Sequence, residues 1–129
     1  MPVACLITGA HVARLAVAFT LAWTHSVEKS EWQEDWRATP QGLVLDTVRV
    51  EGSGAGMEPP EDATREGRFY VAHPLLPPQR EVLLRRSGAT ADWRVCMDGT
   101  CRPMGTLLGA LSTDLSPAAA DPVRLTVCD

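Results

Sequence analysis

The clearest structural signal in this chain is the sequence LAVAFTLAWTHSV, residues 15–27. Larger side chains occupy every second position of it: Leu15, Val17, Phe19, Leu21, Trp23, His25 and Val27. Alternate residues of an extended chain point to opposite faces, whereas the face of a helix repeats every three or four residues. This stretch therefore predicts a strand with one buried face.

The same period of two continues in the next part of the chain. Residues 32–38 place Trp32, Glu34 and Trp36 on one face of a second strand. A Thr-Pro-Gln-Gly segment at residues 39–42 has the composition of a tight turn. It predicts a hairpin between residues 32–38 and residues 43–50, which are rich in β-branched side chains.

Further short runs of strand-like sequence follow at residues 63–65, 68–73, 81–86, 92–97 and 123–128. Only residues 104–112 allow a helix, and Gly105 and Gly109 limit it to one or two turns. With 129 residues, of which 45% are hydrophobic, the chain has room for one core. We expect a single all-β domain over residues 1–129, a small antiparallel β-sandwich or partly closed β-barrel of seven to nine strands.

Charge and hydropathy exclude several classes of protein. The formal net charge is -4, so a broad basic face for nucleic acid is not expected. The most apolar stretch, residues 3–23, is interrupted by polar residues and by Arg14, so we expect no transmembrane segment. The first residues lack the cationic region of a signal peptide, and a signal sequence is therefore expected to be absent from this chain.

The four cysteines predict two disulfide bonds. Asp98-Gly99 suits a two-residue type I′ turn, which would place Cys96 directly opposite Cys101. Cys5 and Cys128 could then pair if the first and last strands are neighbours. A zinc site and four reduced cysteines are the alternatives. Disulfides favour an extracytoplasmic protein.

The candidate ligand-binding residues gather around the tryptophan-rich part of the chain. His25 and Glu34 each lie on the apolar face of a strand, where a polar group is either a bonded core residue or part of a ligand site. His25, Lys29 and Arg37 are the candidate partners of Glu34. Because Ser26 is adjacent to His25, their side chains would point to opposite faces, which disfavours a serine hydrolase.

A glycine-rich segment, Gly54-Ala55-Gly56-Met57, is the second candidate region. It lacks the Gly-Lys-Ser/Thr ending of a phosphate-binding P-loop, and no strand–helix unit of a dinucleotide site surrounds it. Exposed backbone N–H groups in such a loop can hold an anion. We therefore expect a rim of a binding site here and no nucleotide cofactor.

Three motifs carry a family resemblance: Thr24-His25-Ser26-Val27-Glu28, Glu34-Asp35-Trp36 and Gly52-Ser53-Gly54-Ala55-Gly56-Met57. Together with the Cys96–Cys101 hairpin, the chain from about Phe19 to Pro103 resembles the bacterial domain-of-unknown-function family eighteen-fifty. Members are typically encoded beside tripartite ATP-independent periplasmic (TRAP) transporters with TAXI-type receptors. The resemblance implies a periplasmic accessory protein of organic-acid or amino-acid uptake, and it implies no activity.

The expected function is therefore non-enzymatic binding, without cofactor or metal. The partner would be the TRAP receptor or permease, or a small carboxylate ligand. The candidate ligand-binding residues are His25, Ser26, Glu28, Glu34, Trp36, Gly54, Ala55, Gly56 and Met57. Two alternatives stay open: a metal-dependent or hydrolytic enzyme that uses His25, Glu28 and Glu34, and a purely structural protein-interaction module.

Overall fold

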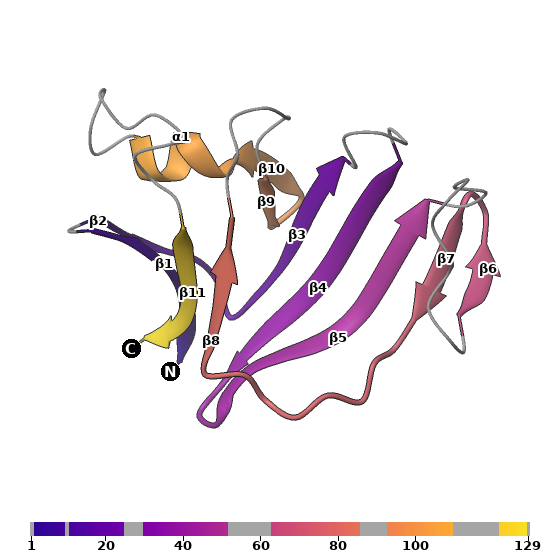
Figure 1. Cartoon of the computed structure of the whole chain (residues 1–129), viewed down its shortest axis with the longest axis horizontal. Helices are drawn as coiled ribbons and strands as arrows, with labels where there is room; N and C mark the ends of the chain where they lie inside the picture. The colour runs from indigo at the N-terminus through magenta and orange to yellow at the C-terminus, as the bar shows by residue number, and fades with distance from the viewer. Residues whose placement is uncertain are drawn as a thin grey trace.

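A computed structural model describes residues 2–9, 11–24, 30–51, 63–85, 93–109 and 122–128. These residues form eleven strands and one short helix (Figure 1). In chain order the elements are β1 (Val3–Thr8), β2 (His11–Arg14), β3 (Ala18–Thr24), β4 (Glu31–Thr39), β5 (Gly42–Glu51), β6 (Thr64–Glu66), β7 (Phe69–Ala72), β8 (Glu81–Leu84), β9 (Arg94–Met97), β10 (Thr100–Pro103), α1 (Met104–Gly109) and β11 (Val123–Cys128).

The strands form two antiparallel sheets. The smaller sheet has the order β2-β1-β11-β8, and the larger has the order β10-β9-β3-β4-β5-β7-β6. Neither sheet closes on itself within the described residues, so the fold is an all-β sandwich and not a barrel, with one short helix as expected. The strand count exceeds the expected seven to nine because β1, β2 and β10 add three strands to the eight runs that the sequence predicted.

Residues 15–24, the described part of the alternating stretch, are divided between the two sheets. Ala18–Thr24 is β3, which lies between β9 and β4 in the larger sheet, but residues 15–17 cross between the sheets instead of extending that strand. The N–H of Leu15 donates to Ala4 O of β1 at 2.7 Å, whereas Val17 O accepts from Ala38 N of β4 at 2.7 Å. Residues 15 and 16 lie outside any strand, and the chain bends at Val17 before β3 begins. The alternation of side chains along the sequence does not show this change of hydrogen-bond partners.

The predicted hairpin of residues 32–38 and 43–50 is confirmed as β4 and β5, joined by Pro40-Gln41. The two strands change register between Asp35 and Trp36, where β5 carries one extra residue, Asp46. On the turn side of this bulge the hairpin reaches the smaller sheet (Figure 1). On the other side of the bulge, β5 pairs with β7, and β7 pairs with the edge strand β6.

The core lies between the inner faces of the sheets and under α1. Its fully buried large side chains come from both sheets and from the helix: Leu6, Leu21, Leu43, Val95, Met104, Leu108, Val123 and Leu125. The helix has only six residues, and its Met104 N–H donates to Trp93 O at 2.7 Å. No helix in the described ranges is long and apolar enough to cross a membrane.

Both predicted disulfides are present. Cys96 lies directly opposite Cys101 across the β9–β10 hairpin, with Cα atoms 3.9 Å apart. Asp98 and Gly99 both have positive φ, 52° and 80°, as a type I′ turn requires. Cys5 and Cys128 join β1 to β11 with Cα atoms 6.0 Å apart. Since all four sulfurs are paired, the alternatives of a zinc site and of reduced cysteines do not hold.

Candidate functional site

Strand β4 carries different chemistry on its two faces. Trp32, Glu34 and Trp36 lie on the inner face, as predicted, where the cross-strand neighbours of Glu34 are Leu21 of β3 and Val48 of β5. The intervening residues of β4 point to the outer face, where they meet charged groups. The alternation of the sequence therefore sorts apolar and charged groups to opposite sides of one strand.

Glu34 is a carboxylate in a mostly apolar environment. Its burial raises the pKa of the carboxyl group above the ordinary value of 4.5, and a hydrogen bond from the Trp36 indole Nε1–H to Oε1, 3.1 Å long, opposes that rise. The prediction that Arg37 pairs with Glu34 is wrong. Arg37 forms an exposed ion pair with Asp46 instead, with Nε 3.0 Å from Oδ2. Arg37 follows Trp36 in the strand and so points to the other face.

Trp36 holds Glu34 from within the core. Only 6% of Trp36 is exposed, and its cross-strand neighbours are Phe19 and Leu45. The indole N–H is satisfied by the carboxylate, so a buried donor and a partly buried acceptor compensate each other. The two candidate residues are thus brought into direct contact, with Glu34 nearer to solvent.

Three indoles, Trp23, Trp32 and Trp93, form a tryptophan cluster at the end of the larger sheet where β4 begins. Trp23 and Trp32 are stacked directly across β3 and β4, with ring centroids 5.4 Å apart. Trp93, just before β9, packs on Trp23 with centroids 4.5 Å apart, and its Nε1–H donates to Arg85 O at 2.9 Å. All three are half-buried.

One polar atom of the tryptophan cluster is unsatisfied. Trp32 Nε1 is buried and has no hydrogen-bond partner in the part of the chain that the structure describes. A buried donor without a partner costs about 1–3 kcal/mol. The contact between Trp23 and Trp32 was not predicted, because it depends on the pairing of Thr24 with Glu31 across β3 and β4, and the sequence does not show where that pairing begins.

The outer face of the same strands carries a polar network. Arg49 of β5 donates to both oxygens of Asp35, at 2.8 and 2.5 Å, and to Gln33 Oε1 at 2.8 Å. Gln33 Nε2 donates to Glu31, which also pairs with Arg94 of β9. Because every one of these groups has a partner, the network ties β9, β4 and β5 together and is a structural feature of the sheet.

The pKa values of the network's carboxyl groups follow from these contacts. Partial burial raises the pKa of Asp35, but hydrogen bonds from Arg49 and Thr20 outweigh it, so the pKa lies below the ordinary value of 3.8. Burial also raises the pKa of Glu31, but hydrogen bonds from Arg94 and Gln33 lower it by more, so its pKa lies below the ordinary value of 4.5. Asp35 in turn raises the pKa of Arg49 through its hydrogen bond.

Several candidate residues lie outside the described residues: His25, Ser26, Glu28, Gly54, Ala55, Gly56 and Met57, together with the expected Glu34 partner Lys29. The described residues that flank them are neighbours. Thr24 pairs with Glu31 across β3 and β4, and the N–H of Glu31 donates to Glu51 Oε1 at 3.0 Å. Both candidate segments therefore attach at the end of the sheet that carries the tryptophan cluster.

The other two histidines, His11 and His73, lie in or next to strands and contact neighbouring strand residues. His11 begins β2, opposite Thr8 of β1. His73 follows β7, with Nδ1 3.3 Å from both Thr47 Oγ1 and Asp46 O. Among the described residues, no three His, Cys, Asp or Glu side chains gather as metal ligands.

A family model, Domain of unknown function (DUF1850), matches residues 19–104. The chain belongs to this family. Apart from Ala18, the first residue of β3, the DUF1850 region contains every strand of the larger sheet, as well as β8, and it leaves β1, β2 and β11 outside. Glu34, the tryptophan cluster and both undescribed candidate segments thus lie in the family region. No curated protein and no solved structure matches the chain.

Proposed function

We propose that this DUF1850 protein is a non-enzymatic, extracytoplasmic accessory protein of a TAXI-type TRAP transporter, and that it binds the transporter's solute receptor. The observation that carries the proposal is the tryptophan cluster, three half-buried indoles at one end of the larger sheet. Tryptophan is enriched at the residues that dominate the binding energy of protein interfaces. The association with a TRAP transporter rests on the family resemblance.

The position of the candidate residues supports a binding surface at this end. The segments that carry His25 and Gly54 attach beside the cluster, at Thr24 and Glu51. Glu34 lies on the same face, one alternate position from Trp32. Aromatic groups beside a few polar groups are the composition of an interface centre, where apolar contacts supply affinity and polar ones supply specificity.

A protein partner fits this end better than an anionic solute does. The arginines on β4, β5 and β9 already pair with carboxylates: Arg37 with Asp46, Arg49 with Asp35 and Arg94 with Glu31. Glu34 adds a further acidic group on the inner face. An anion bound beside it would meet like charge, and these three arginines are already paired with carboxylates.

The two disulfides support the extracytoplasmic part of the proposal. Disulfides form and persist in oxidising compartments such as the periplasm, and thiol-reducing systems remove them in the cytosol. Mass spectrometry of the protein purified from periplasmic extract without reductant should find no free thiol. Four free thiols in that extract would contradict this compartment.

Isothermal titration of the purified, oxidised protein against the TAXI-type receptor and against the permease tests the binding proposal. The receptor should bind, and His25→Ala should weaken that binding by about tenfold or more, as expected for a central interface residue. His73→Ala is the matched control, because His73 is an exposed histidine at the far end of β7. It should bind as the unchanged protein does.

Two results would contradict the proposal. One is the absence of binding to the receptor by the folded protein, whether or not the permease binds. The other is equal affinity of the His25→Ala and His73→Ala variants together with an unchanged affinity for Trp93→Ala, which removes one indole of the cluster. Melting temperatures of all variants distinguish lost contacts from lost folding.

A further inference from the structure

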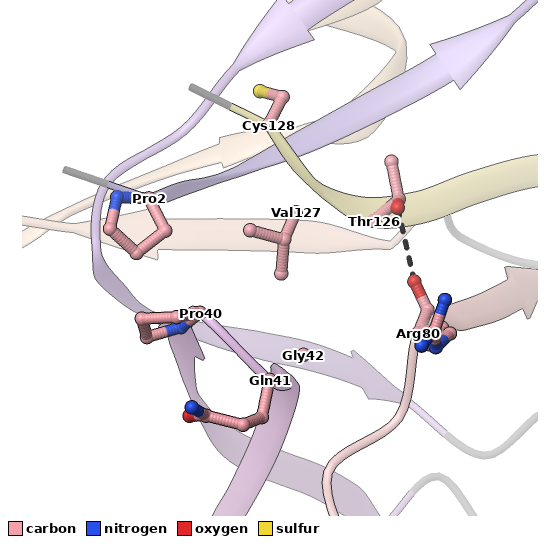
Figure 2. Close-up of a pocket in the computed structure, with 8 residues that line it drawn as sticks. All are labelled: Pro2, Pro40, Gln41, Gly42, Arg80, Thr126, Val127 and Cys128. Atoms are coloured by element: carbon pink, nitrogen blue, oxygen red, sulfur yellow. Dashed lines mark hydrogen bonds between the residues drawn. The ribbon is translucent and has the colours of Figure 1, made fainter.

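The opposite end of the molecule has a groove that no part of the proposed function uses. It lies where the β4–β5 turn meets the ends of β1 and β11, and its volume is about 800 Å³. Its lining is Pro2, Pro40, Gln41, Gly42, Arg80, Thr126, Val127 and Cys128 (Figure 2). This volume is in the range of sites that hold small molecules.

The groove has a fixed backbone framework. Leu43 and Gln79 exchange two backbone hydrogen bonds, 2.7 and 2.8 Å long, which tie the chain before β8 to the larger sheet. One residue later, Arg80 O accepts a hydrogen bond from Thr126 Oγ1 of β11 at 3.0 Å, which ties it to the smaller sheet (Figure 2). The backbone of Arg80 is therefore held from both sheets.

Gly42 is required for this arrangement. Its φ is +134°, and a Cβ atom there would lie 2.7 Å from Gln79 O. Only glycine allows the β5 backbone and residue 79 to approach so closely. The glycine at position 42 therefore allows two segments that are far apart along the chain to lie side by side at the groove.

The charge in the groove is unbalanced. Arg80 is exposed, and no described residue pairs with its guanidinium group, whereas five other arginines of the described ranges pair with carboxylates. The neighbouring acid, Glu81, already pairs with Arg124 at 3.3 Å. The described lining contains no carboxylate.

The rest of the lining suits a small organic ligand. In Figure 2, Pro2, Pro40 and Val127 lie on one side of the groove, and Arg80 lies on the other. The three apolar side chains offer a surface for a hydrocarbon part, and the amide of Gln41 adds donors and an acceptor. A planar guanidinium group pairs with a carboxylate through two parallel hydrogen bonds.

We propose that this groove is a second binding site, which takes the carboxylate of a small organic acid through Arg80. This goes beyond the proposed function, because it concerns the other end of the molecule and needs neither His25 nor the tryptophan cluster. A failure here leaves receptor binding untouched, and the reverse also holds.

Titration of ¹⁵N-labelled protein with succinate and with glutamate, followed by NMR, tests the proposal. Saturable shifts are expected at the amides of Gln41, Gly42, Arg80 and Val127. Arg80→Gln should weaken binding by about tenfold or more, since it removes a charge-assisted pair. Arg102→Gln is the matched control, because Arg102 is an exposed arginine of β10, and its affinity should equal that of the unchanged protein.

The source of the carboxylate is tested in the same experiment. Succinamide should not bind, and trialanine with a free or an amidated C-terminus shows whether the groove also takes the end of a peptide. If both free acids leave the groove amides unshifted while only the free-acid peptide shifts them, the ligand is a peptide terminus and the organic-acid proposal is wrong. No saturable shift with any probe, or equal binding by Arg80→Gln, would also overturn it.

Discussion

Glu34 and Asp35 are consecutive carboxyl groups whose pKa values are shifted in opposite directions. Glu34 points to the inner face, where burial raises its pKa and one indole N–H is its hydrogen-bond partner. Asp35 points to the outer face, where Arg49 and Thr20 lower its pKa despite partial burial. Rising pH is therefore expected to reduce the stability contributed by Glu34 and to increase the stability contributed by Asp35, although the two residues are adjacent.

The raised pKa of Glu34 predicts a loss of stability as pH rises. The folded protein binds the Glu34 proton more tightly than the unfolded chain does, so the free energy of unfolding should decrease from the ordinary pKa of 4.5 upward through the raised value. Glu34→Gln keeps an oxygen for the Trp36 indole and removes this decrease. Urea unfolding from about pH 4 to 8 should show the variant more stable than the parent at the upper end. A less stable variant at neutral pH would contradict this reading of Glu34.

Asp35→Asn should have the opposite effect. The variant loses the ion pair with Arg49, whose side chain is 26% exposed while that of Asp35 is 35% exposed, and should be less stable at neutral pH by about 1 kcal/mol. Because the folded pKa of Asp35 is lowered, the difference between variant and parent should be full above pH 3.8 and shrink as pH falls through the folded value. The same urea titrations measure it. A difference that stays constant into acid would show that the charge of Asp35 is not responsible.

At the scale of elements, the β4–β5 hairpin is the part of the fold that reaches both ends of the molecule. Its turn, with Gly42, forms one wall of the groove, and its other end carries Trp32 and Glu51. The extra residue Asp46 separates the half that meets the smaller sheet from the half that pairs with β7. The hairpin therefore carries residues of both proposed binding regions.

Gly42→Ala should be strongly destabilising. The added Cβ would contact Gln79 O at 2.7 Å, so the bridge between residues 43 and 79 must open, in addition to about 1–3 kcal/mol of backbone strain. Gly67→Ala is the control: its φ is +63°, but a Cβ there meets nothing within 4 Å, so it should cost only about 1–2 kcal/mol. Urea unfolding compares the two. Equal losses of stability would mean that the close contact between residues 42 and 79 does not add to the cost of the substitution.

The elements that the sequence predicted are those whose signal is local. The hairpin of β4 and β5 and that of β9 and β10 each have an alternating pattern next to a turn of suitable composition. The crossing at residues 15–17 and the order of the strands depend on pairing between distant segments, which no local pattern contains. For the same reason the sequence predicted that Glu34 shares a face with Trp32 and Trp36, but not that Trp36 is its hydrogen-bond partner. It also predicted neither the stacking of Trp23 on Trp32 nor the groove around Arg80.

On the scale of the whole molecule, the two disulfides close loops of very different size. Cys96 and Cys101 are 5 residues apart, and Cys5 and Cys128 are 123 residues apart. A cross-link restricts the unfolded chain more when the loop is longer. The bond between Cys5 and Cys128 also joins β1 and β11, which lie outside the family region, to each other at the edge of the groove.

Paired serine substitutions should reveal this difference. Replacing Cys5 and Cys128 should lower the free energy of unfolding by about 4–5 kcal/mol, and replacing Cys96 and Cys101 by about 2 kcal/mol, if the entropy of the unfolded chain dominates. Denaturant unfolding of both variants, without reductant, measures the two losses. A larger loss for the Cys96/Cys101 variant would show that native packing around the small loop matters more.

The bond between Cys5 and Cys128 makes most of the chain a covalent ring, and the ring includes the exposed connection at residues 73–78, where Leu75 is 99% exposed. A protease that cuts this connection once would yield two pieces that remain one molecule. Such a nicked protein should migrate at nearly its original size without reductant and separate into two fragments when reductant is added. While the disulfide stays oxidised, a single cut of this kind leaves the two pieces covalently linked. They can separate only after the bond is reduced.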